Sequence, residues 1–231
     1  MMDFEVIKTG YLECDKGMVT LGRDMGKNIR LPVFCFLVKH KKGNVLIDTG
    51  FSLDFKDSWG KRLRFYNPSI EKDIVGHLKE RKMKVDFVIN THLHVDHCGN
   101  NSAFRDSVII VQKREFKSAI KPKIYQKFAY PDSVDKKLDY KLIDGKLDLF
   151  NDGKINIVPT YGHTRGHQSV LLDIDGRKIF IAGDACYTSE NLKYNCLPGI
   201  LWNPDKIISC YKMIKEMENT KIIFGHEEVS L

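Results

Sequence analysis

The segment 86–100 reads DFVINTHLHVDHCGN. Its first residues form an apolar run typical of a buried strand. The next residues place three histidines and one aspartate within six positions. Core packing does not explain this density, because buried polar groups without partners cost several kcal/mol. Imidazole and carboxylate groups together favour a transition metal, so His92, His94, Asp96 and His97 are predicted metal ligands.

The spacing of these four residues indicates two metal positions. In an extended segment, side chains two residues apart point to the same side, so His92 and His94 can share one ion. Asp96 and His97 follow a turn and can reach a second ion. Three later motifs add candidate ligands at or just after the end of an apolar run: His163 or His167 in YGHTRGHQS, Asp184 in IAGDACY, and His226 in IIFGHEE.

Apolar runs bounded by turn signals predict two comparable sets of strands. The first set covers 4–9, 31–38, 45–47, 87–90 and 108–111, and the second covers 155–158, 169–174, 178–182 and 221–224. One helix is predicted within 69–82, with a buried stripe at Ile70, Ile74, Val75 and Leu78. Another follows Asn203 and Pro204, with a stripe at Ile207, Ile208, Tyr211 and Ile214. We therefore expect an α/β (α+β) protein in which two mixed β-sheets form a sandwich flanked by helices.

Length and composition indicate one domain over residues 1–231, since 42% of the residues are hydrophobic. The longest apolar run, 33–38, is far shorter than the about 20 residues that span a membrane. The start of the chain has no secretory signal, so we expect a cytoplasmic protein without a membrane partner. The six cysteines form no C-x-x-C pair, and packing is favoured over metal ligation for Cys98 and Cys186.

Two further segments stand out by composition. The net charge is +7, and 113–146 holds ten basic and five acidic residues. Because these charges are interleaved and no nucleic-acid motif is present, the segment predicts a solvated helical face and no specific nucleic-acid partner. The segments 10–29 and 51–67 are long and irregular. The second contains Phe51, Phe55, Trp59, Phe65 and Tyr66, which predict a lid or an interface such as that of a homodimer.

The motifs HxHxDH, GHTxGH, GDA and a late GH, in this order, resemble the metallo-β-lactamase superfamily over nearly the whole chain. In the segment LIDTG, Asp48 matches the superfamily's aspartate beneath the metal site. The resemblance implies an αββα sandwich with two divalent ions, zinc first, with iron, manganese or cobalt as alternatives. One ion would be held by His92, His94 and His163, the other by Asp96, His97 and His226, with Asp184 bridging both. His167 would orient a ligand through a hydrogen bond.

Within the superfamily the chain is most similar to the N-acyl homoserine lactonases, through LPVFCFLV, INTHLHVDHCGNNSAF, GHTRGHQSVLL and GDACYTSEN. Tyr187 falls where these enzymes carry a tyrosine that touches the substrate. The resemblance implies quorum quenching, in which a metal-bridging hydroxide opens the lactone ring of an N-acyl homoserine lactone. In that reaction Tyr187 would stabilise the oxyanion, and Asp96 would protonate the leaving alkoxide.

Other members of the fold remain alternatives. A thioesterase of the glyoxalase II kind shares the same seven ligands, but it binds glutathione with a helical C-terminal extension, and none follows GHEEVSL. True β-lactamases usually lack the bridging carboxylate, so Asp184 argues against them. A processing nuclease is supported only by the mild basic surplus. A noncatalytic binding relative usually loses ligands, whereas this chain retains all seven.

Overall fold

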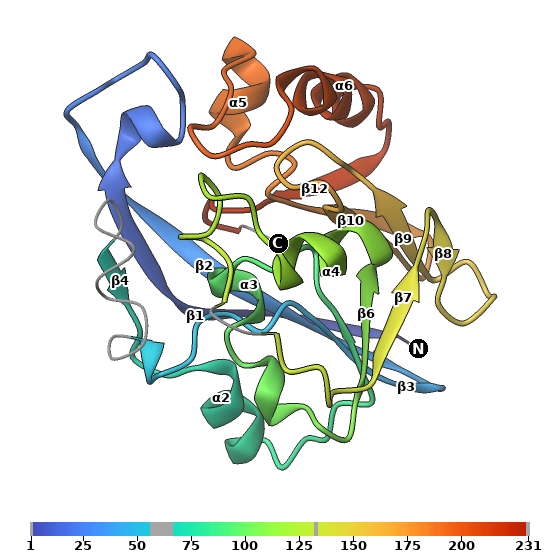
Figure 1. Cartoon of the computed structure of the whole chain (residues 1–231). Coiled ribbons are helices and arrows are strands. Elements are labelled where there is room, and N and C mark those ends of the chain that lie inside the picture. Colours follow the sequence, from blue (N-terminus) through green and yellow to red (C-terminus); the bar gives the residue numbers. More distant parts are fainter. Residues whose placement is uncertain (1, 56–66, 132–133, 230–231) are drawn as a thin grey trace.

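The computed structural model describes residues 2–55, 67–131 and 134–229. Within these residues the strands form two sheets (Figure 1). The first sheet has the order β4-β1-β2-β3-β5-β6-β7, and the second has the order β12-β11-β10-β9-β8. The strands of the first sheet are β1 (Asp3–Asp15), β2 (Asn28–His40), β3 (Gly43–Ile47), β4 (Asn67–Ser69), β5 (Phe87–Ile89), β6 (Val108–Gln112) and β7 (Tyr140–Ile143). Those of the second are β8 (Leu147–Asp148), β9 (Ile155–Pro159), β10 (Gln168–Ile174), β11 (Arg177–Gly183) and β12 (Thr220–Phe224).

Both sheets are mixed, as predicted. In the first sheet β4, β1, β2 and β3 pair antiparallel, whereas β3, β5, β6 and β7 pair parallel. In the second sheet the pairing is antiparallel except between β11 and β12, which run parallel. The first predicted strand set therefore forms one sheet, and the second set forms the other.

Helices α2 (Ile74–Glu80) and α6 (Pro204–Lys215) cover opposite outer faces of the sandwich. The other helices among the described residues are α3 (Val95–Cys98), α4 (Lys113–Ile120) and α5 (Ser189–Tyr194), with short 3-10 turns at Lys16–Met18 and Asn101–Ala103. Figure 1 shows α2 at the bottom of the molecule and α6 at the top, with the sheets between them. This arrangement confirms the predicted αββα sandwich.

The alternation of side chains along the strands explains the layers. On β2, Phe34 and Phe36 face the second sheet and share a core with Ile157 and Val170. Cys35 and Leu37, which alternate with them, point the other way and pack with residues of α2. On the far side, Ile207, Tyr211 and Ile214 of α6 pack against Phe180 and Ala182 of β11. Burial of each such apolar side chain stabilises the fold by about 1.5–3 kcal/mol.

Helix α2 is shorter than the sequence pattern predicted. Asp73 caps it, and its carboxylate accepts a hydrogen bond from the Gly76 N–H at 2.9 Å. Ile74 and Leu78 are buried as expected. The prediction was wrong for the other two residues of the stripe. Ile70 precedes the helix and packs in a different cluster, and Val75 is exposed. The Asp73 cap, which the apolar spacing did not include, sets the start of the helix.

The segment 10–29 is less irregular than predicted. Strand β1 continues to Asp15 and β2 begins at Asn28, so that Leu12 pairs with Leu31. The strand pairing shifts in register before Gly10, where the sequence analysis had ended the first strand. A Cβ atom there would lie 2.5 Å from the Ser69 carbonyl oxygen, so the glycine permits close approach of β4 and does not end the strand.

The basic segment 113–146 is helical only in α4, and β7 and turns make up much of the remainder. All ten of its basic residues are exposed, which confirms the prediction of a solvated surface. Sequence analysis gave no bounds for α4 and missed α3, α5 and the short strands β4, β7 and β8. These elements have at most eight residues each, too few to show a clear hydrophobic period.

All six cysteines are free. Cys98 packs with Leu93 and Tyr130, and Cys186 packs with Phe180 and Ile207. Burial raises the pKa of both thiols far above the usual range, which agrees with a packing role. Within the described parts of the chain, no helix has the length and apolarity needed to cross a membrane.

The predicted helix after Asn203 is α6, and its cap provides a test of local stability. The Asn203 side chain accepts a hydrogen bond from the Lys206 N–H at 3.0 Å, and Pro204 occupies the first turn. Replacing Asn203 with Ala should lower the free energy of unfolding by roughly 1 kcal/mol, measured by urea denaturation. Ser209→Ala, on the exposed side of the same helix, should have little effect. Equal losses in the two variants would contradict a capping role.

Candidate metal centre

The predicted ligands lie at one edge of the sandwich, where strands of both sheets end. His92 and His94 follow β5, and Asp96 and His97 lie on α3. His163 lies in the connection between β9 and β10, and the last two ligands, Asp184 and His226, follow β11 and β12 directly. Ends of parallel strands are a common place for ligand sites, because loops from several strands meet there.

The structure brings these residues together in two groups. The ligand atoms of the first group lie within 4.8 Å of one another, and so do those of the second. The first group is His92, His94 and His163, and the second is Asp96, His97, Asp184 and His226. Asp96 is half-buried and the other six residues are buried. These groups contain the same residues as the two ligand sets that the family resemblance implied. The one difference is that Asp184, expected to bridge both ions, falls in the second group.

Asp184 lies between the two groups, with one carboxylate oxygen facing each. Its Oδ2 atom is 3.2 Å from His163 Nε2 and 3.7 Å from His92 Nε2. Its Oδ1 atom is 3.3 Å from His97 Nε2 and 3.2 Å from His226 Nε2. This is the arrangement that a carboxylate bridging two ions requires.

The donor atoms fit a divalent metal. His92 is completely buried, and its Nε2 atom has no hydrogen-bond partner among the described residues. An unpaired buried nitrogen is costly, and it points into the group formed with His94 and His163. His94 Nδ1 and His163 Nε2 are only 2.9 Å apart, so two ring nitrogens converge on the same space. Nitrogen and carboxylate oxygen donors of this kind are typical of zinc and related ions.

Burial sets the protonation of the first group. It lowers the pKa of His92, His94 and His163, and for the first two the neighbouring histidines lower it further. Their imidazoles are therefore neutral at physiological pH, which is the form that binds metal.

In the second group, the charges of aspartates and histidines stabilise one another. Burial acts against the charged form of His97, but Asp96, Asp184 and Asp48 together raise its pKa well above the usual range. Burial likewise acts against the charged form of Asp184, but His97, His226 and His163 hold its pKa well below the usual range. A proton and a metal ion compete for the same ring nitrogen, so metal binding to this group is expected to release protons.

Hydrogen bonds at Nδ1 orient three of the rings. His163 Nδ1 lies 2.9 Å from the Ile200 carbonyl oxygen, and His226 Nδ1 lies 3.0 Å from that of Pro32. His97 Nδ1 lies 2.7 Å from Asp48 Oδ2. In each case Nε2 is left to face Asp184. Such contacts fix the ring and its tautomer, and thereby the direction of the metal-binding nitrogen.

Asp48 occupies the place that the LIDTG motif predicted. Besides His97, its carboxylate accepts hydrogen bonds from the N–H and the hydroxyl of Thr91, each at 2.7 Å. Its backbone has a φ of 58°, a left-handed conformation that aspartate tolerates better than most residues. Asp48 thus ties the end of β3 to the loop that carries His92.

His167 belongs to neither group, so His163 is the ligand candidate of the GHTRGH motif. The Nε2 atom of His167 accepts a hydrogen bond from the Asp184 N–H at 2.9 Å, and Nδ1 lies 2.8 Å from the Thr160 hydroxyl. Burial lowers the pKa of His167 to about 3, which keeps Nε2 free to accept. His167 therefore orients the backbone of the bridging residue.

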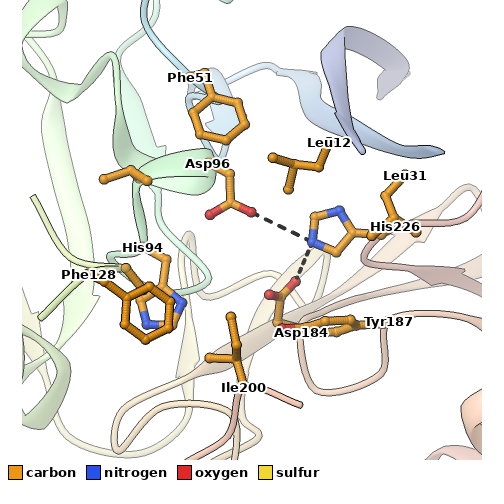
Figure 2. Close-up of a pocket in the computed structure, with 12 residues that line it drawn as sticks. Leu12, Leu31, Phe51, His94, Asp96, Phe128, Asp184, Tyr187, Ile200 and His226 are labelled. Carbon is orange, nitrogen blue, oxygen red and sulfur yellow. Dashed lines mark ion pairs between the residues drawn. The ribbon is translucent and has the colours of Figure 1, made fainter. Parts of the chain in front are cut away.

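A pocket with largely apolar walls opens onto the second group (Figure 2). Asp96, Asp184 and His226 lie on one side of it, joined by ion pairs. Tyr187 lies beside them, with its hydroxyl 3.4 Å from His163 Nδ1 and its ring against that of His226. The apolar lining consists of Leu12, Leu31, Phe51, Val95, Phe128, Ala129 and Ile200.

Sequence analysis missed most of this lining. Leu12, Leu31, Phe128 and Ile200 come from four distant segments, and no local pattern distinguishes them from core residues. Phe51, part of the predicted lid, does line the pocket and packs against Phe55 with ring centroids 4.4 Å apart. The other aromatic residues of that prediction, Trp59, Phe65 and Tyr66, lie outside the described residues.

Comparison with known proteins points in one direction. The N-acyl homoserine lactonase AiiA of Bacillus thuringiensis subsp. kurstaki is 29% identical over 238 residues, which cover 96% of this chain and 91% of that protein. The N-acyl homoserine lactonase AttM of Agrobacterium fabrum is 28% identical over 241 residues, with 96% and 92% coverage.

Solved structures agree. An N-acyl homoserine lactone hydrolase with the product N-hexanoyl-L-homoserine at its catalytic metal center superposes with a TM-score of 0.85 at 29% identity, over 96% of this chain and 92% of that one. The dizinc quorum-quenching lactonase AidC has a TM-score of 0.73 at 15% identity, over 97% and 87%, which shows the fold alone. A family model of the metallo-beta-lactamase superfamily matches residues 28–226, a span that contains both ligand groups, and the chain therefore belongs to that superfamily.

Proposed function

We propose that this protein is a dinuclear metal-dependent hydrolase that opens the lactone ring of N-acyl homoserine lactones. The observation that carries the proposal is the position of Asp184, which faces one ligand group with each oxygen, beside the Tyr187 hydroxyl and an apolar pocket. Relatives that carry the name N-acyl homoserine lactonase over almost the whole chain support this substrate class.

The first ion would be held by His92, His94 and His163, and the second by Asp96, His97 and His226, with Asp184 shared. Zinc is proposed first because the donors are imidazole and carboxylate, and iron, manganese and cobalt also suit them. When bound, two such ions supply a hydroxide nucleophile at neutral pH and polarise the carbonyl of the substrate.

The pocket residues have distinct tasks in this proposal. The apolar side chains around Phe51 and Phe128 would seat the acyl chain and exclude water from the site. The Tyr187 hydroxyl would donate a hydrogen bond to the carbonyl oxygen as it gains charge. Burial acts against a charged Asp96, yet His97 holds the pKa of that carboxyl below its usual value. Asp96 is therefore ionised at neutral pH, and its carboxylate could take up the proton of the hydroxyl that has added to the lactone carbonyl and pass it to the ring oxygen as the ring C–O bond breaks.

A reducing, cytoplasmic location is also proposed, and the six free cysteines support it. We propose that residues 1–231 act as one hydrolase domain. A homodimer formed through 51–67 stays a prediction, since most of that segment lies outside the described residues.

The substrate class is tested by turnover on acyl homoserine lactones of different chain lengths, beside thioesters and simple lactones. The proposal expects the highest kcat/KM on acyl homoserine lactones. The metal ligands cannot distinguish a lactonase from a glyoxalase II-like thioesterase, because both use the same set. A higher kcat/KM on glutathione thioesters would therefore favour the thioesterase.

Metal content tests the shared ligand. The parent protein should bind about two ions per chain by elemental analysis. Asp184→Asn keeps the size of the side chain but removes its charge, so both ions should bind more weakly at once. Asp173→Asn changes an aspartate whose carboxylate accepts from the Gly176 N–H on a distant turn, and should leave metal content unchanged. An Asp184→Asn protein that retains one ion with the affinity of the parent would show that this residue does not bridge.

Tyr187→Phe tests the proposed oxyanion contact, because it removes only the hydroxyl. On an acyl homoserine lactone kcat/KM should fall by roughly 10- to 100-fold, since metal would still stabilise the oxyanion. The fall should be smaller on an activated aryl ester, whose leaving group needs little assistance. Tyr194→Phe, at an exposed tyrosine, is the matched control. If the Tyr187 variant opens lactones as fast as the parent with metal bound, Tyr187 only packs the pocket wall.

A further inference from the structure

Glu115, on the first turn of α4, is a completely buried acid that belongs to neither ligand group. In sequence it is one of five acidic residues in the basic segment 113–146, with no motif around it. Acidic side chains are almost never fully buried unless they are paired. The contacts of its carboxylate therefore require an explanation.

The Glu115 carboxylate joins the two loops that carry the three-histidine group. Its Oε1 atom accepts a hydrogen bond from the Leu93 N–H at 3.1 Å, and Leu93 lies between His92 and His94. Its Oε2 atom accepts one from the Gly166 N–H at 3.0 Å, in the β9–β10 loop that carries His163. One side chain on a helix thus binds the backbone of both loops.

A third contact reaches the same group through an aromatic ring. The Tyr130 hydroxyl donates a hydrogen bond to Glu115 Oε1 at 3.1 Å. The Tyr130 ring packs edge-on against the ring of His94, with centroids 4.8 Å apart. Burial raises the pKa of Glu115, but the Leu93, Gly166 and Tyr130 groups are donors and favour the ionised carboxylate, which has acceptors only.

Gly166 packs so closely against Glu115 that no side chain fits between them. A Cβ atom at this position would lie 2.3 Å from the Glu115 backbone nitrogen, so only glycine allows the loop to rest on the first turn of α4. The second group has different supports: His97 contacts Asp48, and His226 contacts the Pro32 carbonyl oxygen. The contacts of Glu115 are therefore made beside the ligands of the three-histidine group: Leu93 lies between His92 and His94, and Gly166 lies in the loop of His163.

We propose that Glu115 is a positioning residue that clamps the loops of His92, His94 and His163 together and thereby sets the metal affinity of that group. The inference rests on the metal centre of the proposed function, but it does not depend on which ester is hydrolysed. Residues that orient metal ligands typically change metal affinity by roughly 10- to 100-fold when they are replaced.

The test measures Zn²⁺ affinity at each group separately, by competition with a chelator. In a His226→Ala protein the second group lacks a ligand, so the remaining tight site reports on the three histidines. In a His163→Ala protein it reports on the second group. Glu115→Gln keeps the side-chain size but replaces one acceptor oxygen by an NH₂ donor. It should weaken Zn²⁺ binding by roughly 10- to 100-fold in the His226→Ala protein and leave it unchanged in the His163→Ala protein.

Two variants separate positioning from general loss of stability. Asp73→Ala removes another buried carboxylate, which caps α2 and contacts neither loop, and it should lower stability, as the loss of a helix cap does, without changing Zn²⁺ affinity. Tyr130→Phe removes one of the three donors to Glu115 and should weaken only the three-histidine site, by less than Glu115→Gln. Tyr130→Phe decides the question if Glu115→Gln does not fold.

Equal weakening of both groups by Glu115→Gln, or no selective effect of Tyr130→Phe, would overturn the inference. So would an Asp73→Ala protein whose Zn²⁺ affinity falls as far as that of Glu115→Gln. Because Zn²⁺ affinity is the readout, a parent that binds two ions but opens no lactone would overturn the proposed substrate alone.

Discussion

The Asp184 carboxylate is buried between imidazoles from both sheets, and the rest of the site depends on this placement. Each of its oxygens lies within 3.7 Å of two ring nitrogens. Removing a carboxylate from water costs several kcal/mol unless cations or hydrogen bonds compensate. The compensating histidines follow β5 of the first sheet and β9 and β12 of the second, so the charge is balanced only when the two sheets are packed together.

The ligand geometry in turn depends on backbone contacts further out. The Pro32 carbonyl belongs to β2 and the Ile200 carbonyl to the segment before α6, and each contacts one histidine. Asp48 and Glu115 act in a similar way, because each is a buried carboxylate that accepts from backbone N–H groups of a ligand-bearing loop. The site is thus held by main-chain groups that a folded sandwich positions and an unfolded chain does not.

The grouping of the candidate ligands could be predicted because metal chemistry demands particular residue types, and those residues cluster in sequence after strongly apolar strands. Helix α6 could be predicted from the Asn203 cap and its apolar stripe for the same local reason. Glu115 could not, since its role arises from hydrogen bonds to Leu93 and Gly166, which lie 22 and 51 residues away. The continuation of β1 past Gly10 could not be predicted either. The glycine is needed there because β4 approaches closely, and the local sequence does not show this contact.

The two aspartates of the second group differ in burial, and this difference separates their tasks. The Asp184 side chain is 3% exposed and faces four histidines, so it is suited to hold charge in place. The Asp96 side chain is 14% exposed, lies at the start of the short helix α3, and borders the pocket next to Val95. A carboxylate that exchanges protons with a substrate must reach it, whereas one that bridges two sites must not move. Both aspartates line the pocket, but Asp96 is the more exposed and Asp184 lies between histidines of the two sheets, which suits each to its proposed task.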